Sequence, residues 1–175
     1  MPPYQEMSAK RALRSARGEA LRQAYIDDGG WEKVDGWLYL KALRLTDYID
    51  KLQDHFGVFG NICEIGLYFG KYFIFLNLIK RINEKVIGID LFEISDWEKQ
   101  FYDNLGAWPR DDGDPMIIRR NSLEVNAKEL LEWAGGPYRL FSVDGGHSCE
   151  VALNDLRLAH EVIADGGVIM VDDYF

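Results

Sequence analysis

Short apolar runs alternate with helical patterns along most of the chain, from about residue 61 to residue 172. The runs are nearly continuous in Val, Ile and Leu, which is typical of strands buried on both faces of a parallel sheet. Strands and helices that alternate in this way indicate an α/β fold, a doubly wound and mostly parallel sheet with helices on both faces. The predicted strands are residues 61–67, 85–92, 116–120, 138–144 and 168–172.

Helical periodicity predicts helices between these strands and two more before them. The intervening helices cover residues 71–82, about 96–105, 127–133 and 148–163, and residues 106–114 form a turn-rich loop. Of the two N-terminal helices, 8–25 has only a thin alanine stripe, as in a lid or arm, whereas 36–56 has a broad apolar face that should pack on the main body. We therefore divide the chain into an N-terminal helical extension, residues 1–57, and an α/β domain, residues 58–175.

Composition and charge exclude several classes of protein. The chain has 175 residues, 47% of them hydrophobic, which suffices for one core. Its formal charge of -9, without a dense Lys/Arg run, argues against a nucleic-acid partner. No apolar stretch approaches the roughly 18 residues that a membrane span needs, so neither membrane insertion nor secretion is indicated. Cys63 and Cys149 lack ligand spacing and are expected to be free thiols in a reducing cytoplasm.

Acidic residues follow the last two predicted strands. Asp144 begins the sequence Asp-Gly-Gly-His that ends at His147, and Asp172 and Asp173 follow the next run. Parallel neighbours would bring these carboxylates into one crevice, where three hard oxygen donors suit Mg²⁺ or Mn²⁺. Each acid could instead belong to a turn or to a hydrophilic strand end. Together, however, they would repel one another unless a cation or protons intervene. His147 could act as a base or only hydrogen-bond a helix start.

A glycine-containing turn follows the first predicted strand. Gly66 and Gly70 allow backbone to pass close to a ligand, but they can equally reflect positive φ or tight packing. The turn lacks the G-x-G-x-x-G pattern of pyrophosphate binding, which disfavours NAD. Asp90 ends the second strand, 24 residues after Gly66, where a carboxylate can bind both hydroxyls of a ribose or cap a helix. A ligand that carries a nucleoside without pyrophosphate fits this combination.

The three segments 64–70, 88–90 and 143–148 resemble the class I S-adenosylmethionine-dependent methyltransferases. Within that class they are similar to metal-dependent sugar O-methyltransferases related to macrolide 2''-O-methyltransferase, over residues 61–175. The resemblance implies a Rossmann-like sheet, and it implies a role for each site residue. The implied cofactor residues are Glu64, Gly66, Tyr68, Gly70 and Asp90, with Asn121 and Ser122 on the adenine side; the implied metal ligands are Asp144, Asp172 and Asp173; and the implied catalytic residues are Asp144 and His147.

Two departures from the relatives bear on function. Cys149 stands where they usually carry tyrosine, which puts the acceptor in doubt. The sequence also ends just after its fifth strand, whereas the family's sheet has seven strands. Residues 168–171 would then form an apolar sheet edge, so we expect a homo-oligomer in which a partner subunit covers it, or a longer polypeptide.

We expect a metal-dependent O-methyltransferase that transfers the methyl group of S-adenosylmethionine to a hydroxyl of a sugar or related polyol. The alternative is a truncated, non-catalytic module that binds the cofactor or a partner. A nicotinamide-dependent oxidoreductase is a weaker third hypothesis.

The remaining conspicuous residues are given structural roles. His55 and His160 are expected on the surface. A set of aromatic residues could line an acceptor pocket, although aromatics at helical spacing belong more often to a core. These aromatics are Trp31, Trp37, Tyr39, Tyr68, Tyr72 and Phe73.

Overall fold

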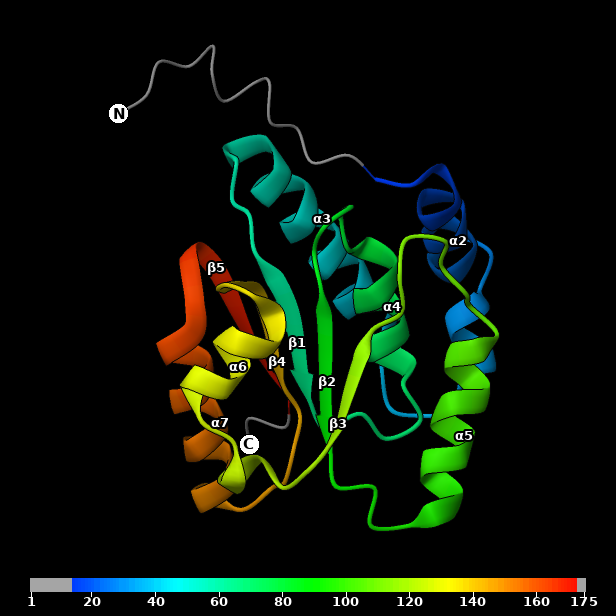
Figure 1. Cartoon of the computed structure of the whole chain (residues 1–175). Helices are drawn as coiled ribbons and strands as arrows, with labels where there is room; N and C mark the ends of the chain where they lie inside the picture. Colours follow the sequence, from blue (N-terminus) through cyan, green and yellow to red (C-terminus); the bar gives the residue numbers. More distant parts are fainter. Residues whose placement is uncertain (1–13, 173–175) are drawn as a thin grey trace, which may run out of the picture.

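A single five-stranded sheet organises the fold, and all its strand pairs are parallel. The computed structural model, shown in Figure 1, describes residues 14–172 of the chain. The spatial order of the strands is β3-β2-β1-β4-β5, which confirms the predicted doubly wound α/β fold. The strands are β1 (Asn61–Ile65), β2 (Val86–Asp90), β3 (Met116–Arg119), β4 (Tyr138–Val143) and β5 (Ile163–Val171).

Helices cover both faces of the sheet (Figure 1). One face carries α2 (Ala16–Ile26), α3 (Leu40–Phe56), α4 (Lys71–Ile79) and α5 (Ser95–Gly106), and the other carries α6 (Ala127–Ala134) and α7 (Cys149–Val162). Successive strand residues point to opposite faces, so Ile62 packs into the core under α4 whereas Cys63 packs into the core under α6 and α7. The short helices η2 (Gly30–Lys33) and η3 (Ser122–Glu124) lie in connections.

The N-terminal helices differ from their predicted limits. Helix α2 begins at Ala16, because the Ser15 side chain accepts a hydrogen bond from the Gly18 amide; residues 8–13 of the predicted helix lie outside the described part of the chain. Its buried residues include Tyr25, not the predicted alanine stripe. Helix α3 begins at Leu40 rather than at residue 36, so the preceding residues form an irregular segment.

The strands also depart from the sequence prediction in two places. Strand β5 begins at Ile163, five residues earlier than predicted, because Ile163 pairs with Tyr138 at the start of β4. Strands β3 and β5 lie at the two edges of the sheet and their residues are exposed or half-buried, so the prediction of uniformly buried strands is wrong for both edge strands.

A buried ionic network joins α3 to the amino end of β4. Arg139 places Nη1 3.0 Å from Asp50 Oδ1 and Nε 2.7 Å from Glu84 Oε1. Gln53 of α3 donates from Nε2 to the Arg139 carbonyl at 2.7 Å. Arg139 and Asp50 are both fully buried. Burial raises the pKa of Asp50, and the neighbouring Arg139 guanidinium opposes that shift.

No helix among residues 14–172 combines the length and the apolar character required to cross a membrane.

Arg139→Ala should reduce the free energy of unfolding by about 3–5 kcal/mol, because it removes the fully buried guanidinium that pairs with Asp50 and with the half-buried Glu84. Urea denaturation measures the change. Lys99→Ala is the control, since Lys99 forms an exposed ion pair with Asp103 and its loss should change stability by less than about 0.5 kcal/mol. Equal effects for the two variants would show that the network does not stabilise the fold.

Candidate functional site

The carboxyl ends of all five parallel strands lie at one edge of the sheet. The strand order reverses at β1, because β2 and β3 lie on one side of it and β4 and β5 on the other. Backbone hydrogen bonds continue beyond the strands, from Asp144 N to Ile65 O at 2.8 Å and from Asp172 N to Val143 O at 3.1 Å. In open α/β sheets, ligands bind in the crevice at such a reversal.

The turn after β1 requires glycine at its first position. Gly66 has φ +88°, and a Cβ built on it would lie 1.8 Å from the Asp144 carbonyl oxygen. The sequence left open two structural reasons for glycine here, positive φ and tight packing, and both apply to Gly66. Gly70 has φ +82°, precedes α4, and a Cβ there would lie 2.9 Å from Phe101 Cδ2. Gly66 thus brings the turns after β1 and β4 into contact.

Asp90 anchors this turn from the end of β2. Its Oδ2 accepts hydrogen bonds from the amides of Leu67 at 2.7 Å and Tyr68 at 3.3 Å, and its Oδ1 accepts one from Phe92 at 2.6 Å. Tyr68 is held at φ +47°, in the left-handed region that non-glycine residues rarely adopt. A carboxylate has about four acceptor sites, so these three bonds leave capacity for about one more, such as a ribose hydroxyl.

Glu64 is a buried carboxyl group within β1, with 1% of its surface exposed. Ser142 Oγ lies 3.4 Å from its Oε1, a long contact, and its Oε2 has no hydrogen-bond partner among residues 14–172. Burial raises the pKa of Glu64 well above its usual value, and the negative charges of Asp144, Asp90 and Asp172 raise it further. Acidic groups therefore concentrate at this edge of the sheet.

The predicted metal ligands end adjacent strands. Val143 pairs with Val171, so Asp144 and Asp172 begin neighbouring turns, as the sequence predicted. Asp173 lies outside the described residues. Within residues 14–172, no three His, Cys, Asp or Glu side chains form a group that could hold a metal ion. The donor type still fits a hard divalent cation, because the described ligands are carboxylates.

His147 lies exposed in the connection from β4 to α7. Ser148 supplies the N-cap of that helix, because its Oγ accepts a hydrogen bond from the Val151 amide at 3.3 Å. The role of His147 as a base stays a prediction.

The adenine-side residues predicted from the resemblance lie in the connection after β3. The Asn121 side chain caps η3 by accepting a hydrogen bond from the Leu123 amide at 3.0 Å, and Ser122 is buried. Asn154 of α7 donates to the Ser122 carbonyl at 3.2 Å. The structure therefore ties this connection to the helix that follows the Asp144 turn.

Asp155 is a buried carboxyl group that the sequence analysis missed. It is fully buried in α7, its Oδ1 accepts a hydrogen bond from Asn154, and burial raises its pKa. A Cβ on Gly145 would lie 2.9 Å from its Oδ2, so it supports the turn after β4. Its position on the same helix face as Leu158, Ala159 and Val162 was the available signal.

Several other sequence expectations can be compared with the structure. His55 and His160 are exposed as expected, and Cys63 and Cys149 are free thiols. Among the aromatics, Phe73 belongs to the core, but Trp37 and Tyr39 are 89% and 75% exposed, so the core interpretation is wrong for these two.

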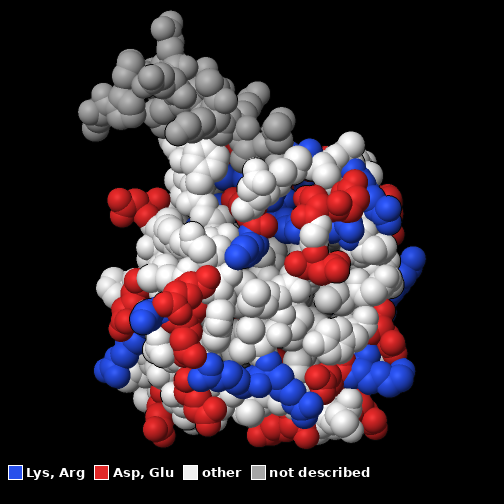
Figure 2. Space-filling model, viewed as in Figure 1, with Lys and Arg blue, Asp and Glu red and all other residues white. Residues whose placement is uncertain are grey.

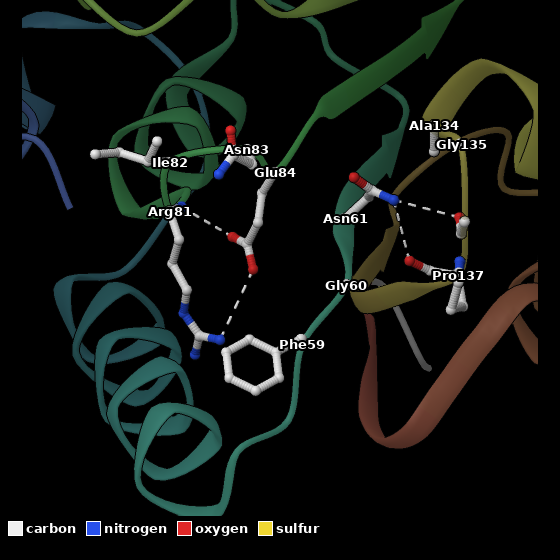
Figure 3. A pocket seen from close by; sticks show the side chains of 11 residues that line it. Phe59, Gly60, Asn61, Arg81, Ile82, Asn83, Glu84, Ala134, Gly135 and Pro137 are labelled. Carbon is white, nitrogen blue, oxygen red and sulfur yellow. Dashed lines mark hydrogen bonds and ion pairs between the residues drawn. The ribbon is translucent and has the colours of Figure 1, made fainter. Parts of the chain in front are cut away.

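A groove of about 470 Å³ lies at the opposite, amino edge of the sheet (Figure 3). Its walls include Phe59, Asn61, Arg81 and Glu84. The Asn61 side chain donates to the carbonyls of Gly136 and Pro137, and Glu84 pairs with Arg81 and Arg139. These polar groups serve the fold, and none of the predicted site residues lines the groove.

Gly66→Ala should lower the free energy of unfolding by at least about 2 kcal/mol, because a side chain there combines left-handed strain with a backbone clash. Gly106→Ala is the matched control. Nothing lies within 4 Å of a Cβ at Gly106, which ends α5, so that change should be neutral or slightly stabilising. Urea denaturation compares the two, and a Gly66→Ala variant as stable as the wild type would contradict the required close approach.

Glu64→Gln should alter the pH dependence of stability. Because the folded-state pKa of Glu64 lies above its usual 4.5, its stabilising contribution is complete below that pH and is lost as pH rises toward the folded-state pKa. Between the usual pKa and the folded-state pKa of Glu64, the free energy of unfolding of the wild type should fall relative to that of the variant. The fall should be at most about 1.4 kcal/mol per pH unit. Urea titrations at about pH 5, 6 and 7 measure this, and a constant difference between the proteins would contradict the shifted pKa.

Comparison with known proteins identifies the family. A sequence model of a methyltransferase domain matches residues 63–174, well over half of the chain. No curated protein sequence matches significantly. The structure of CalS11, a calicheamicin methyltransferase, shares 14% identity over 77% of this chain and 64% of its own, with a TM-score of 0.62. The O-methyltransferase TomG from Streptomyces achromogenes, solved with S-adenosylmethionine, shares 15% identity over 95% of this chain and 69% of its own, with a TM-score of 0.61.

The chain thus spans about two thirds of the length of these two structures. At such low identities the structural matches establish the shared fold, whereas the family match rests on the sequence itself. The same residues, 63–174, contain the Gly66 turn, the Asp90 anchor and the Asp144 turn at the reversal of the sheet. With fold, strand-end turns and sequence family in agreement, the chain belongs to the class I S-adenosylmethionine-dependent methyltransferases.

Proposed function

We propose that this protein transfers the methyl group of S-adenosylmethionine to a hydroxyl of a sugar or related polyol, with the help of Mg²⁺ or Mn²⁺. The observation that carries the proposal is the contact between the turns after β1 and β4, which brings the Gly66 turn, the Asp144 turn and the end of β5 to one edge. Cofactor residues and acceptor residues would therefore share a crevice.

The cofactor would lie along the turns after β1, β2 and β3. Glu64, Gly66, Tyr68 and Gly70 would face its methionine part, and Asp90 would accept hydrogen bonds from the ribose hydroxyls. Two features support this assignment, namely the close approach of the Gly66 and Asp144 turns and the fixed orientation of Asp90. Asn121 and Ser122 would line the adenine side.

The acceptor would lie beside the turns after β4 and β5. Asp144, Asp172 and Asp173 would hold the cation, which when bound would lower the pKa of a coordinated hydroxyl. His147 would accept the proton of that hydroxyl, because an imidazole titrates near neutral pH. The acidic concentration that raises the pKa of Glu64 supports a cation at this edge, since a positive charge would relieve the repulsion.

The charge distribution favours a small-molecule acceptor over nucleic acid. The formal charge is -9, and on the face drawn in Figure 2 acidic and basic side chains are interspersed around a large uncharged area. We further propose that residues 1–57 form a helical extension of the catalytic domain and that the protein acts in the cytoplasm as a homo-oligomer.

A second candidate function is binding without catalysis. It is favoured by one observation, that β5 ends the sheet of the described residues with one edge unpaired and its side chains half-buried or exposed. Such an edge can recruit a partner strand.

Isothermal titration with S-adenosylmethionine and S-adenosylhomocysteine, with and without Mg²⁺, tests cofactor binding. A methyl-transfer assay on glycosylated acceptors then separates the two functions. We expect cofactor binding, and Mg²⁺-dependent methylation of glycosylated acceptors. Binding without a Mg²⁺ response and without transfer to any polyol would favour the binding module instead.

Asp144→Asn should reduce metal-dependent kcat/KM by at least about 100-fold, because it removes a charged ligand, while cofactor affinity stays nearly unchanged. Asp103→Asn is the control, since Asp103 is an exposed acid of α5 that pairs with Lys99. Full-rate, metal-independent transfer by the Asp144→Asn variant would refute the proposed mechanism.

A further inference from the structure

An exposed tryptophan lies directly beside the glycine turn. Trp37 is 89% exposed, and its ring stacks on that of Tyr68 with a centroid separation of 5.8 Å and an interplanar angle of 26°. Tyr68 also stacks on Phe69 at 3.9 Å, and it forms a T-shaped pair with Trp97 at a centroid separation of 5.0 Å. We call Trp37, Tyr68, Phe69 and Trp97 the aromatic cluster. It joins the segment before α3, the turn after β1 and the start of α5.

The segment that carries Trp37 is held in place by the first residue of α4. Lys71 Nζ donates a hydrogen bond to the Gly36 carbonyl at 3.0 Å and lies 5.0 Å from the centre of the Trp31 ring. The Lys71 carbonyl in turn accepts a hydrogen bond from Tyr25 Oη at 2.6 Å. Trp37 therefore projects from an anchored segment, which reduces the entropy lost when it contacts a ligand.

The aromatic cluster borders the carboxyl edge of the sheet. Helix α3 packs on β5, with Thr46 near Met170 and Gln53 near Gly166, so it runs antiparallel to the strand and starts at the carboxyl edge. Tyr68 belongs to the turn that Asp90 anchors at the same edge. Trp37 and Tyr68 thus lie at the crevice proposed for the cofactor and the acceptor.

The chemistry of the aromatic cluster selects an uncharged ring. Its four side chains carry no formal charge, and Trp37 stacks beside Tyr68 while most of its surface is exposed. An indole face attracts either an aromatic ring or the C–H face of a sugar ring. The charged side chains beside the Trp37 segment have both signs, because Asp35 and Glu32 act on Lys71. The acids at the strand ends would favour a cation, which is the alternative that a cationic probe tests.

We propose that the exposed face of Trp37 stacks against an uncharged ring of the acceptor, either an aromatic ring or the C–H face of a sugar, and that this contact selects acceptors that carry such a ring. This inference rests on the proposed methyltransferase function. It adds a specificity-determining residue from the N-terminal extension to a site otherwise built from strand ends.

Saturation-transfer NMR with purified protein and S-adenosylhomocysteine tests the contact, using three probes: catechol, methyl β-D-glucopyranoside and choline. Wild-type protein should saturate the ring protons of catechol, of the glycoside or of both. Trp37→Ala should weaken that binding about tenfold, since a stacking contact contributes about 1–2 kcal/mol, whereas Trp37→Phe should retain most of it. Tyr48→Ala, which removes an aromatic side chain 59% exposed on α3, is the control and should have no effect.

Each outcome decides between the alternatives. Binding of catechol alone assigns an aromatic acceptor, and binding of the glycoside alone assigns a sugar. The inference is overturned if neither ring compound binds the wild type, or if Trp37→Ala changes the affinity for the ring compounds less than twofold. It is also overturned if choline binds the wild type more tightly than either ring compound. Failure to bind S-adenosylhomocysteine would refute the proposed function separately, because ring binding and its dependence on Trp37 can be measured without that compound.

Discussion

The approach of two backbone turns is the constraint on which this site depends. The turn after β1 passes so close to the Asp144 carbonyl that Gly66 leaves no space for a side chain. This contact fixes the ends of β1 and β4 relative to each other, and the hydrogen bond from Asp172 to Val143 adds the end of β5. Backbone contacts hold the carboxyl ends of β1, β4 and β5 in place, and the side chains at these ends therefore have defined positions.

The same approach concentrates negative charge. Glu64 is buried where Asp144, Asp90 and Asp172 all act on it, and the chain tolerates this arrangement because a raised pKa can keep a carboxyl neutral. The negative potential of such a site favours positively charged ligands. Both ligands proposed here carry positive charge, the divalent cation and the sulfonium cofactor, so one cluster of acids could favour both.

The strand-end residues could be predicted from sequence because each follows an apolar run, and parallel strands bring such positions together. The start of α3 could not, because helical periodicity continues through Leu38, whereas Gly36 has φ +131° and its carbonyl bonds Lys71 from a distant element. The burial of Asp50 could not be predicted either, because in the sequence it is one polar residue among several in the same helix. Arg139, inside an apolar run, was a signal that the sequence analysis did not use.

The ionic network around Arg139 lies at the amino ends of the strands, whereas every proposed ligand contact lies at the carboxyl ends. Substitutions in the ligand-binding turns therefore leave the ionic network around Arg139 untouched. This separation gives the fold evolutionary latitude. Related sequences can change acceptor specificity through substitutions in a few turns at the carboxyl edge. The residues of the network at the amino edge are retained because they stabilise the fold.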